Sequence, residues 1–325
     1  MSSKTDAEIQ LLAIPGMRHT SITDYAINAT ENRFDAMLVM DIEEKDELNN
    51  FITSSNGLVN VNNTITRFQQ RNLDSSFAAA YFPDVRLLDT RTNEIMTVPP
   101  SVAVMGAFSL NDTIGHPWFA PAGFTRGALL NVLEVDTILN QDNLDNLYEA
   151  DINPITSYVG TGPIVWGQKT LLKAQSSLDR VNVRRLLIDV RRKVKKIADT
   201  ILFEPNREAT LARFSAAVNP VLATIQQQQG LDKFKVQIDS TTTTQADIEN
   251  NTIRGKIFLQ PTRSVEFISL DLETTGLDKK NDKIIEISAV KFSNNKVVDK
   301  FTKLINPNKK IPLFIENLTG IKNEH

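Results

Sequence analysis

The chain has 325 residues, with 36 basic and 39 acidic side chains, a formal net charge of -3 and 41% hydrophobic residues. This composition is typical of a folded protein and excludes both a disordered acidic tail and a polycationic nucleic-acid binder. The lack of cysteine excludes disulfides, thiolate metal sites and cysteine nucleophiles, and only three histidines are available for metal or triad chemistry. No apolar stretch has the length of a membrane helix and the start has no apolar leader segment, so neither membrane insertion nor export is expected.

The first half of the chain predicts short strands and helices. Residues 35–42 form an apolar run of strand length, and the acidic residues 41–47 follow it. Because little nearby sequence could cover this strand, we expect residues 1–55 to be the remnant of a larger upstream subdomain. The next expected elements are a helix over 59–71, two strands broken at Pro83 within 77–89, and either a helix or a strand over 97–109.

Two segments of opposite charge lie in the middle of the chain. Residues 133–151 carry six acids and no lysine or arginine. Residues 178–199 carry eight basic residues against three acids, and their apolar residues recur at three-and-four spacing, which predicts an amphipathic helix. The basic face of this helix has three interpretations: a solvated surface, a nucleic-acid site, or a contact with the acidic segment of another subunit. The helix lacks the interleaved aromatic residues of a single-strand binder, so nucleic acid is not the expected partner.

We therefore predict an assembly interface between identical subunits, because complementary charges fix the register of a polymer contact. The predicted interface residues are Arg184, Arg185, Arg191, Arg192, Lys195, Glu134, Asp136, Asp142 and Asp145. The two tryptophans, Trp118 and Trp166, are expected to be buried in the core because of their large apolar surface.

The last third of the chain changes from helix to strand patterns. A helix is expected over 209–229, with a kink or restart at Pro220. A pair of strands with period-two alternation follows at 233–239 and 252–261. The final strand-like runs, separated by short polar turns, predict a β-meander over 266–278, 283–292 and 296–307.

Seven short strings, in this order and spacing, resemble the C-terminal half of contractile phage tail sheath proteins over residues 1–268. They are AAAYFP (78–83), VPPS (98–101), APAG (120–123), VWG (165–167), VNVRRLL (181–187), FEPN (203–206) and PTRSVEFI (261–268). The resemblance implies a mixed α/β domain and a structural subunit that polymerises around a tail tube and contracts, with a terminal strand near 266–268 leading into an arm exchanged with neighbouring subunits. It implies other copies of the chain, a tail tube protein, and baseplate and tail terminator proteins as partners. It implies a place in the virion tail after assembly in the host cytoplasm, with no cofactor and no catalysis.

The C-terminal residues 266–325 resemble a different family, the N-terminal portion of DEDD-type proofreading 3′–5′ exonucleases. The strings are FISLDLETTGLD (267–278), IIEISAVKF (284–292), LINPNKKIP (304–312) and ENLTGI (316–321). The resemblance implies the start of a ribonuclease-H-like fold, in which Asp271 and Glu273 are catalytic carboxylates that bind Mg²⁺ or Mn²⁺. Alternate residues of a strand point to one face, so the two carboxylates can reach the same metal site. The chain ends before the later carboxylate motifs, so an active nuclease is not expected.

Together these patterns predict three parts: the remnant 1–55, a tail-sheath-like domain over 56–268, and a truncated exonuclease-like segment over 269–325. The leading hypothesis is a structural sheath subunit and not an enzyme. Two alternatives stay open: a metal-dependent 3′–5′ exonuclease with an incomplete site, and a non-functional fusion of two fragments.

Overall fold

The structure is a computed structural model that describes residues 8–52, 57–158, 160–239, 241–264, 266, 268–274, 283–293, 296–312, 315 and 321–323. The chain divides into two compact units, Met1–Thr262 (unit 1) and Arg263–His325 (unit 2). This division lies six residues before the boundary that the sequence predicts at 268. In the part of the chain that the structure describes, no helix is long and apolar enough to span a bilayer.

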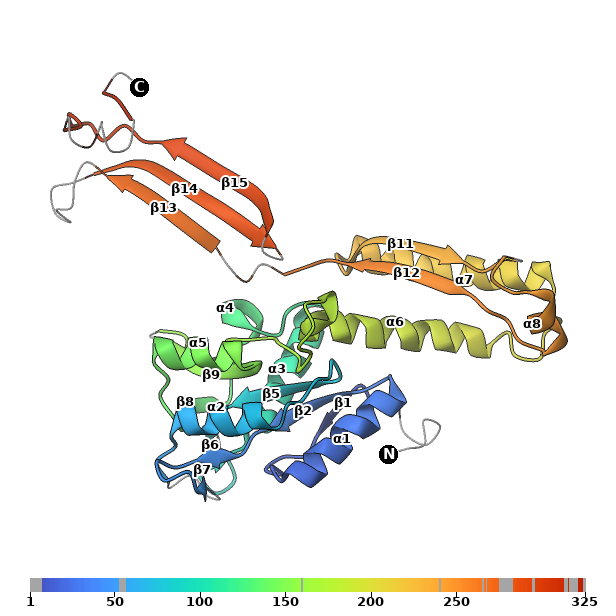
Figure 1. Ribbon diagram of the computed structural model, residues 1–325, viewed down its shortest axis with the longest axis horizontal. Coiled ribbons are helices and arrows are strands. Elements are labelled where there is room, and N and C mark those ends of the chain that lie inside the picture. Colours follow the sequence, from blue (N-terminus) through green and yellow to red (C-terminus); the bar gives the residue numbers. More distant parts are fainter. Residues whose placement is uncertain are drawn as a thin grey trace. The chain divides into compact units, whose positions relative to one another are not determined.

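A five-stranded mixed sheet forms the centre of unit 1 (Figure 1). Its strands, in spatial order, are β1 (Leu11–Ala13), β2 (Met37–Asp41), β5 (Ala78–Phe82), β9 (Ile152–Tyr158) and β10 (Gly162–Val165). The first four strands are parallel, and β10 pairs antiparallel with β9. Parallel strands need both faces covered, and this requirement explains why β2 and β5 are buried at every position.

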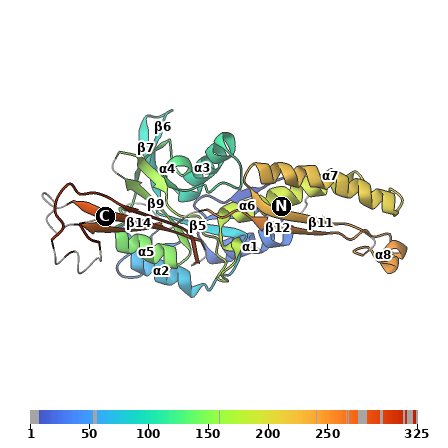
Figure 2. The same cartoon turned by 90° about the horizontal axis from the view of Figure 1, so that it is seen from above.

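Helices cover the two faces of this sheet (Figure 2). Leu38 and Met40 of β2 join one core, which also receives apolar side chains from three helices: α1 (Thr20–Arg33), α2 (Val61–Gln70) and α5 (Gln141–Glu149). The alternate residues Met37 and Val39 join a second core with α3 (Pro100–Ile114) and the start of α6 (Val181–Asp199). Because successive side chains of a strand point to opposite faces, β2 contributes side chains to both cores.

The prediction that residues 1–55 are the remnant of a separate subdomain differs from the structure. β1 and β2 are integral strands of the central sheet, with Leu38 opposite Ala78 in β5, and α1 packs on the same sheet. The cover for β2 comes from segments far along the chain. The local sequence does not reveal this cover, because parallel strands pair only after a long crossover.

A helical hairpin and a β-hairpin form the rest of the core of unit 1. α6 is followed by α7 (Glu208–Gln227), and then β11 (Leu231–Gln237) pairs antiparallel with β12 (Lys256–Pro261). Their third core contains Val218 and Leu222 of α7 and the buried Trp118. The short helix α8 (Gln245–Glu249) connects the two strands and begins with a Thr244–Asp247 capping box.

Smaller sheets complete the two units. β6 (Val85–Asp89) lies between β7 (Glu94–Val98) and β8 (Val132–Val135), and β3 (Glu44–Lys45) pairs with β4 (Phe51–Ile52). The short helix α4 (Gly123–Arg126) and a 3-10 turn over Ser177–Asp179 lie between the larger elements. In unit 2, β13 (Ile268–Thr274), β14 (Ile284–Ser293) and β15 (Lys296–Leu304) form an antiparallel meander, as predicted.

In the open choice over 97–109, Thr97 and Val98 end strand β7, and the apolar run that follows is helix α3, with Pro100 at its first turn, where a missing N–H costs no hydrogen bond. α7 runs through Pro220 as one helix, so the predicted restart is wrong. Trp118 is buried as predicted, but Trp166 is 37% exposed and the prediction of burial is wrong for it. Trp166 instead packs in an aromatic group with Phe124 and Tyr158.

Candidate assembly surfaces

The β11–β12 hairpin presents two strand edges that have no partner strand among the described residues. The pair forms a sheet of its own, with Phe234 opposite Leu259 and Val236 opposite Ile257. An unpaired edge offers a row of backbone N–H and C=O groups that can pair with a strand of another chain. The hairpin is therefore a candidate site for strand addition.

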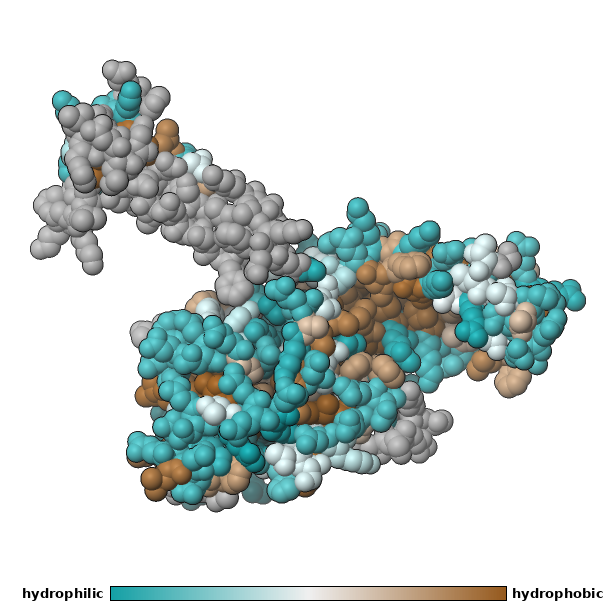
Figure 3. Space-filling model, viewed as in Figure 1, coloured by the Kyte–Doolittle hydropathy of each residue, from teal (hydrophilic) through white to brown (hydrophobic). Residues whose placement is uncertain are grey.

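A half-buried apolar surface lies beside this hairpin. Figure 3 shows apolar side chains gathered between β12 and α6. The residues here that are partly buried against the third core are Val194, Ile197 and Ala198 of α6, Ile201 just after this helix, and Ile257 and Leu259 of β12. α7 packs on β11 and α6 packs on α7, so the α6 side of the hairpin is less covered than the α7 side. The sequence predicted the strand pair but not this surface. The signal that could have indicated it is the period-two pattern of β12, whose alternating burial is that of a strand with one packed face.

Two of the predicted interface residues are inside the subunit. Arg184 is 8% exposed; its Nε donates to the carbonyl oxygen of Ser76 at 3.2 Å, and its guanidinium lies 3.9 Å from the ring centroid of Phe77. Burial lowers the pKa of Arg184 to about 10. Arg185 is 4% exposed, forms an ion pair with Asp112, and lies over the ring of Phe108. The prediction that Arg184 and Arg185 lie at an assembly interface is therefore wrong. Each can be buried because its planar guanidinium packs against an aromatic ring.

The remaining basic residues of α6 lie toward its C-terminal half. Arg191 and Lys195, one turn apart, are exposed, although the guanidinium of Arg191 lies 5.2 Å from the ring centroid of Phe34. Arg192 is partly buried, and its guanidinium forms an ion pair with Glu8 at 2.6 Å. Arg191 and Lys195 are therefore the predicted basic residues that the subunit leaves most accessible to a partner.

The predicted acidic residues also divide into two groups. Glu134 and Asp136 both pair with Arg86, at 2.9 and 2.7 Å, and the side chain of Asp136 is only 4% exposed. They are therefore satisfied within the subunit. Asp142 and Asp145 are exposed on α5, and Glu149 follows on the same helix at the i, i+3, i+7 spacing of a single face.

A buried carboxyl cluster lies where β2, β3, the β5–β6 turn and the end of β8 meet. Asp41 accepts hydrogen bonds from the backbone N–H of Gly16 and of Ser101, at 2.9 and 2.8 Å. Arg18 pairs with Asp84 and lies 3.6 Å from Glu44. Glu44 is 3% exposed, and burial followed by repulsion from Asp84 raises its pKa to about 7. Part of the predicted acidic segment 41–47 is therefore internal to the subunit.

The two carboxylates of the exonuclease hypothesis lie on one strand. Asp271 and Glu273 belong to β13, opposite Ser288 and Glu286 of β14. Their side chains lie outside the described part of the structure. In the part that is described, no three histidine, aspartate or glutamate side chains are grouped to hold a metal ion.

Comparisons with known families agree with both resemblances. The family profile described as "Phage tail sheath protein central domain" matches residues 1–171, and "Phage tail sheath C-terminal domain" matches 173–275. The profile described as "Exonuclease" matches 268–325, so residues 268–275 are matched twice. The doubly matched segment contains all of β13.

Individual relatives show the same division. The tail sheath protein of Vibrio phage KVP40 is 33% identical over 181 residues, which are 56% of this chain and 27% of that relative, so the chain spans about a quarter of its length. The 3′–5′ exonuclease DinG of Bacillus subtilis is 56% identical over 59 residues, which are 18% of this chain and 6% of that protein. Among solved structures, the contracted PVC sheath complex of an extracellular contractile injection system has a TM-score of 0.63 and 27% identity, covering 74% of this chain and 66% of that chain.

Proposed function

Because this chain belongs to the phage tail sheath protein family, we propose that it is a structural subunit of a contractile tail sheath, which self-associates around a tail tube. The relationship to sheath proteins supports a structural and non-enzymatic role. The proposed partners are other copies of the chain, a tail tube protein, and baseplate and tail terminator proteins. The proposed location is the virion tail after assembly in the host cytoplasm, and no cofactor is proposed for unit 1.

The observation that carries this proposal is the open β11–β12 hairpin with the apolar surface beside it. Two unpaired edges can each accept a strand from a neighbouring copy, and main-chain hydrogen bonds then supply affinity with little dependence on side chains. The half-buried residues of α6 and β12 would be covered by the side chains of the added strand. The hairpin therefore serves as an acceptor for a neighbour's strand.

Sedimentation velocity over a concentration series tests this proposal. Wild-type protein should form larger species as its concentration rises. Ile201→Asp puts a charge on the apolar surface and should keep the protein monomeric while leaving its circular dichroism unchanged. The matched control is Ile95→Asp, on the exposed side of β7, which should assemble as wild type does. A wild-type protein that stays monomeric at every concentration, or an assembling Ile201→Asp variant, contradicts the proposal.

A second candidate function is favoured by the exonuclease match over unit 2. In that case Asp271 and Glu273 would be the carboxylates that hold a Mg²⁺ or Mn²⁺ ion, which would polarise a phosphate. The test is degradation of single-stranded DNA with and without Mg²⁺, comparing wild type with Asp271→Ala. The sheath proposal predicts no metal-dependent degradation in either protein. Degradation that is lost in Asp271→Ala would establish the second function.

A further inference from the structure

The loop between α6 and α7 presents a fully exposed phenylalanine. Phe203 is 104% exposed, and its φ of +70° lies in the left-handed region that residues other than glycine seldom adopt. The flanking loop is held in place, because Thr210 Oγ1 donates to the carbonyl oxygen of Pro205 at 2.8 Å and Asn206 donates to that of Thr252 at 3.0 Å. Phe203 is thus an apolar side chain that an ordered loop holds out into solvent.

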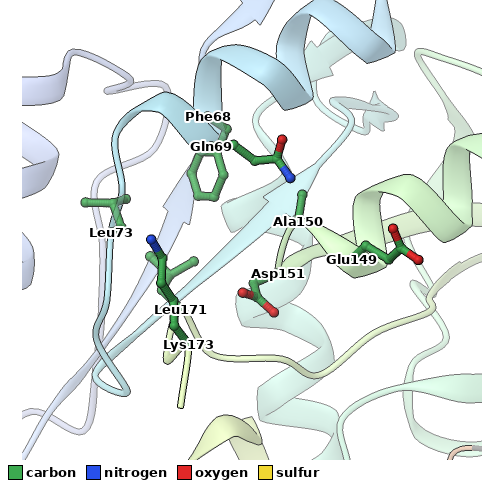
Figure 4. Close-up of a pocket in the computed structure, with 8 residues that line it drawn as sticks. All are labelled: Phe68, Gln69, Leu73, Glu149, Ala150, Asp151, Leu171 and Lys173. Atoms are coloured by element: carbon green, nitrogen blue, oxygen red, sulfur yellow. The ribbon is translucent and has the colours of Figure 1, made fainter. Parts of the chain in front are cut away.

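A half-open pocket of about 350 Å³ lies between the C-terminal ends of α2 and α5. Figure 4 shows Phe68 from α2, Ala150 from just after α5, and Leu171 from the neighbouring segment around it. The pocket has room for a phenylalanine ring, and Phe68, Leu73, Ala150 and Leu171 supply the apolar half of its lining. Its polar rim is formed by Gln69, Glu149, Asp151 and Lys173.

Basic residues precede Phe203 on α6, and acidic residues precede the pocket on α5. On α6, Arg191 and Lys195 lie eight and four residues before the last helical residue, Asp199. On α5, Asp142 and Asp145 lie seven and four residues before the last helical residue, Glu149. At a rise of about 1.5 Å per residue, each helix carries its charges about 6 and 10 to 12 Å before its end. The basic pair on α6 and the acidic pair on α5 therefore have opposite charges at similar distances from the ends of their helices.

One chain cannot bring the two features together. Figures 1 and 2 both show the α6–α7 loop at the end of α6 that points away from α5. We propose that Phe203 of one copy inserts into the pocket between α2 and α5 of a second copy, with Arg191 and Lys195 facing Asp142 and Asp145. This inference rests on the proposed sheath function and names a second contact, separate from strand addition. The contact joins two different surfaces, so it can continue from copy to copy through a polymer.

Disulfide trapping tests the contact directly, because the chain has no cysteine of its own. Phe203→Cys protein is mixed with Gln69→Cys protein, which carries its cysteine on the exposed pocket rim, and the mixture is oxidised. A mixed disulfide dimer is expected. The matched control pairs Phe203→Cys with Ile95→Cys, an exposed position on β7, and should yield little mixed disulfide dimer.

The outcomes separate the two proposals. If wild-type protein assembles but the Phe203→Cys and Gln69→Cys pair gives no more cross-link than the control, the proposed contact between Phe203 and the pocket is wrong while the sheath proposal stands. If wild-type protein does not assemble at any concentration, the sheath proposal itself fails.

Charge reversal supplies an independent test. Arg191→Glu with Lys195→Glu should weaken assembly, and a partner carrying Asp142→Lys with Asp145→Lys should restore it in the mixture. Phe203→Ser should weaken assembly without lowering the melting temperature, because the ring buries nothing in the free subunit. Failure of the charge-reversed mixture to recover, or normal assembly of Phe203→Ser, overturns the contact.

Discussion

The central sheet and the α6–α7–hairpin extension of unit 1 bury their apolar residues to different degrees. Strands β2 and β5 are buried at every position, with helices on both faces. In the extension, β12 alternates between exposed and half-buried residues, and both hairpin edges lack a partner strand among the described residues. The inner strands of the sheet are paired on both sides and covered on both faces, whereas the extension leaves apolar side chains and strand edges that a neighbouring copy can cover.

The largest expected effect comes from the core of the sheet. Phe108→Ala removes a fully buried ring that packs edge-on against Tyr81, and should lower the free energy of unfolding by about 4 kcal/mol. Phe258→Ala, on the exposed face of β12, should lower it by less than about 1 kcal/mol. Urea denaturation of both variants measures the difference. Equal losses would remove the distinction between the two regions.

The next effect separates the buried from the exposed arginines of α6. Arg184→Ala leaves Ser76 and the face of Phe77 without their partner and should cost about 2 to 3 kcal/mol. Arg191→Ala, on the exposed part of the same helix, should change stability by less than about 0.5 kcal/mol. Thermal unfolding of the two variants at one pH tests this, and a destabilised Arg191→Ala protein would contradict the assignment.

A pH-dependent effect is expected at the buried carboxyl cluster. Glu44 has a pKa of about 7 in the folded subunit against an ordinary value of 4.5. Between these values the folded subunit keeps a proton that the unfolded chain has released, so stability falls as pH rises from about 4.5 to about 7 and stays lower above it. Glu44→Gln should therefore stabilise the protein by about 2 kcal/mol near pH 8 and give no gain near pH 4.

Urea denaturation of wild type and Glu44→Gln at both pH values measures this gain. The control is Glu94→Gln, an exposed glutamate on β7, which should shift neither curve. A Glu44→Gln protein that gains equally at both pH values would show that its effect does not come from the ionisation of Glu44.

The smallest effect on stability comes from the charges proposed to act between copies. Arg191→Glu combined with Lys195→Glu should leave the free energy of unfolding within about 0.5 kcal/mol of wild type. The same double variant should need a higher protein concentration to assemble, which light scattering detects. If the double variant unfolds much more readily, these side chains stabilise the subunit instead of the polymer.

The sequence predicted the elements better than their environments. The strand before Pro83 follows from its small and aromatic residues, and the helix within 178–199 and the hairpin after Gly230 follow from local periodicity; the structure has all three. The burial of β2 could not be predicted, because its neighbours β1, β5 and their covering helices come from distant segments. Local sequence therefore indicates an element without showing what will cover it.

Charge was the least informative signal for the candidate interface. Arg184 and Arg191 look alike in the sequence and each lies over a phenylalanine ring, but Arg184 is buried inside the subunit and Arg191 is exposed. Asp136 and Asp142 differ in the same way, since only Asp136 has Arg86 beside it. Which charges remain free for a partner depends on tertiary contacts that the helical pattern does not encode.

The central claim is that this chain polymerises as sheath subunits do. Negative-stain electron microscopy of the purified chain across a concentration series tests it most directly, with Ile201→Asp protein at the same concentrations beside it. The account predicts rings or tubes for wild type and isolated particles for the variant. Isolated particles for both proteins at every concentration would contradict it, whereas rings for both would contradict only the role given to the apolar surface.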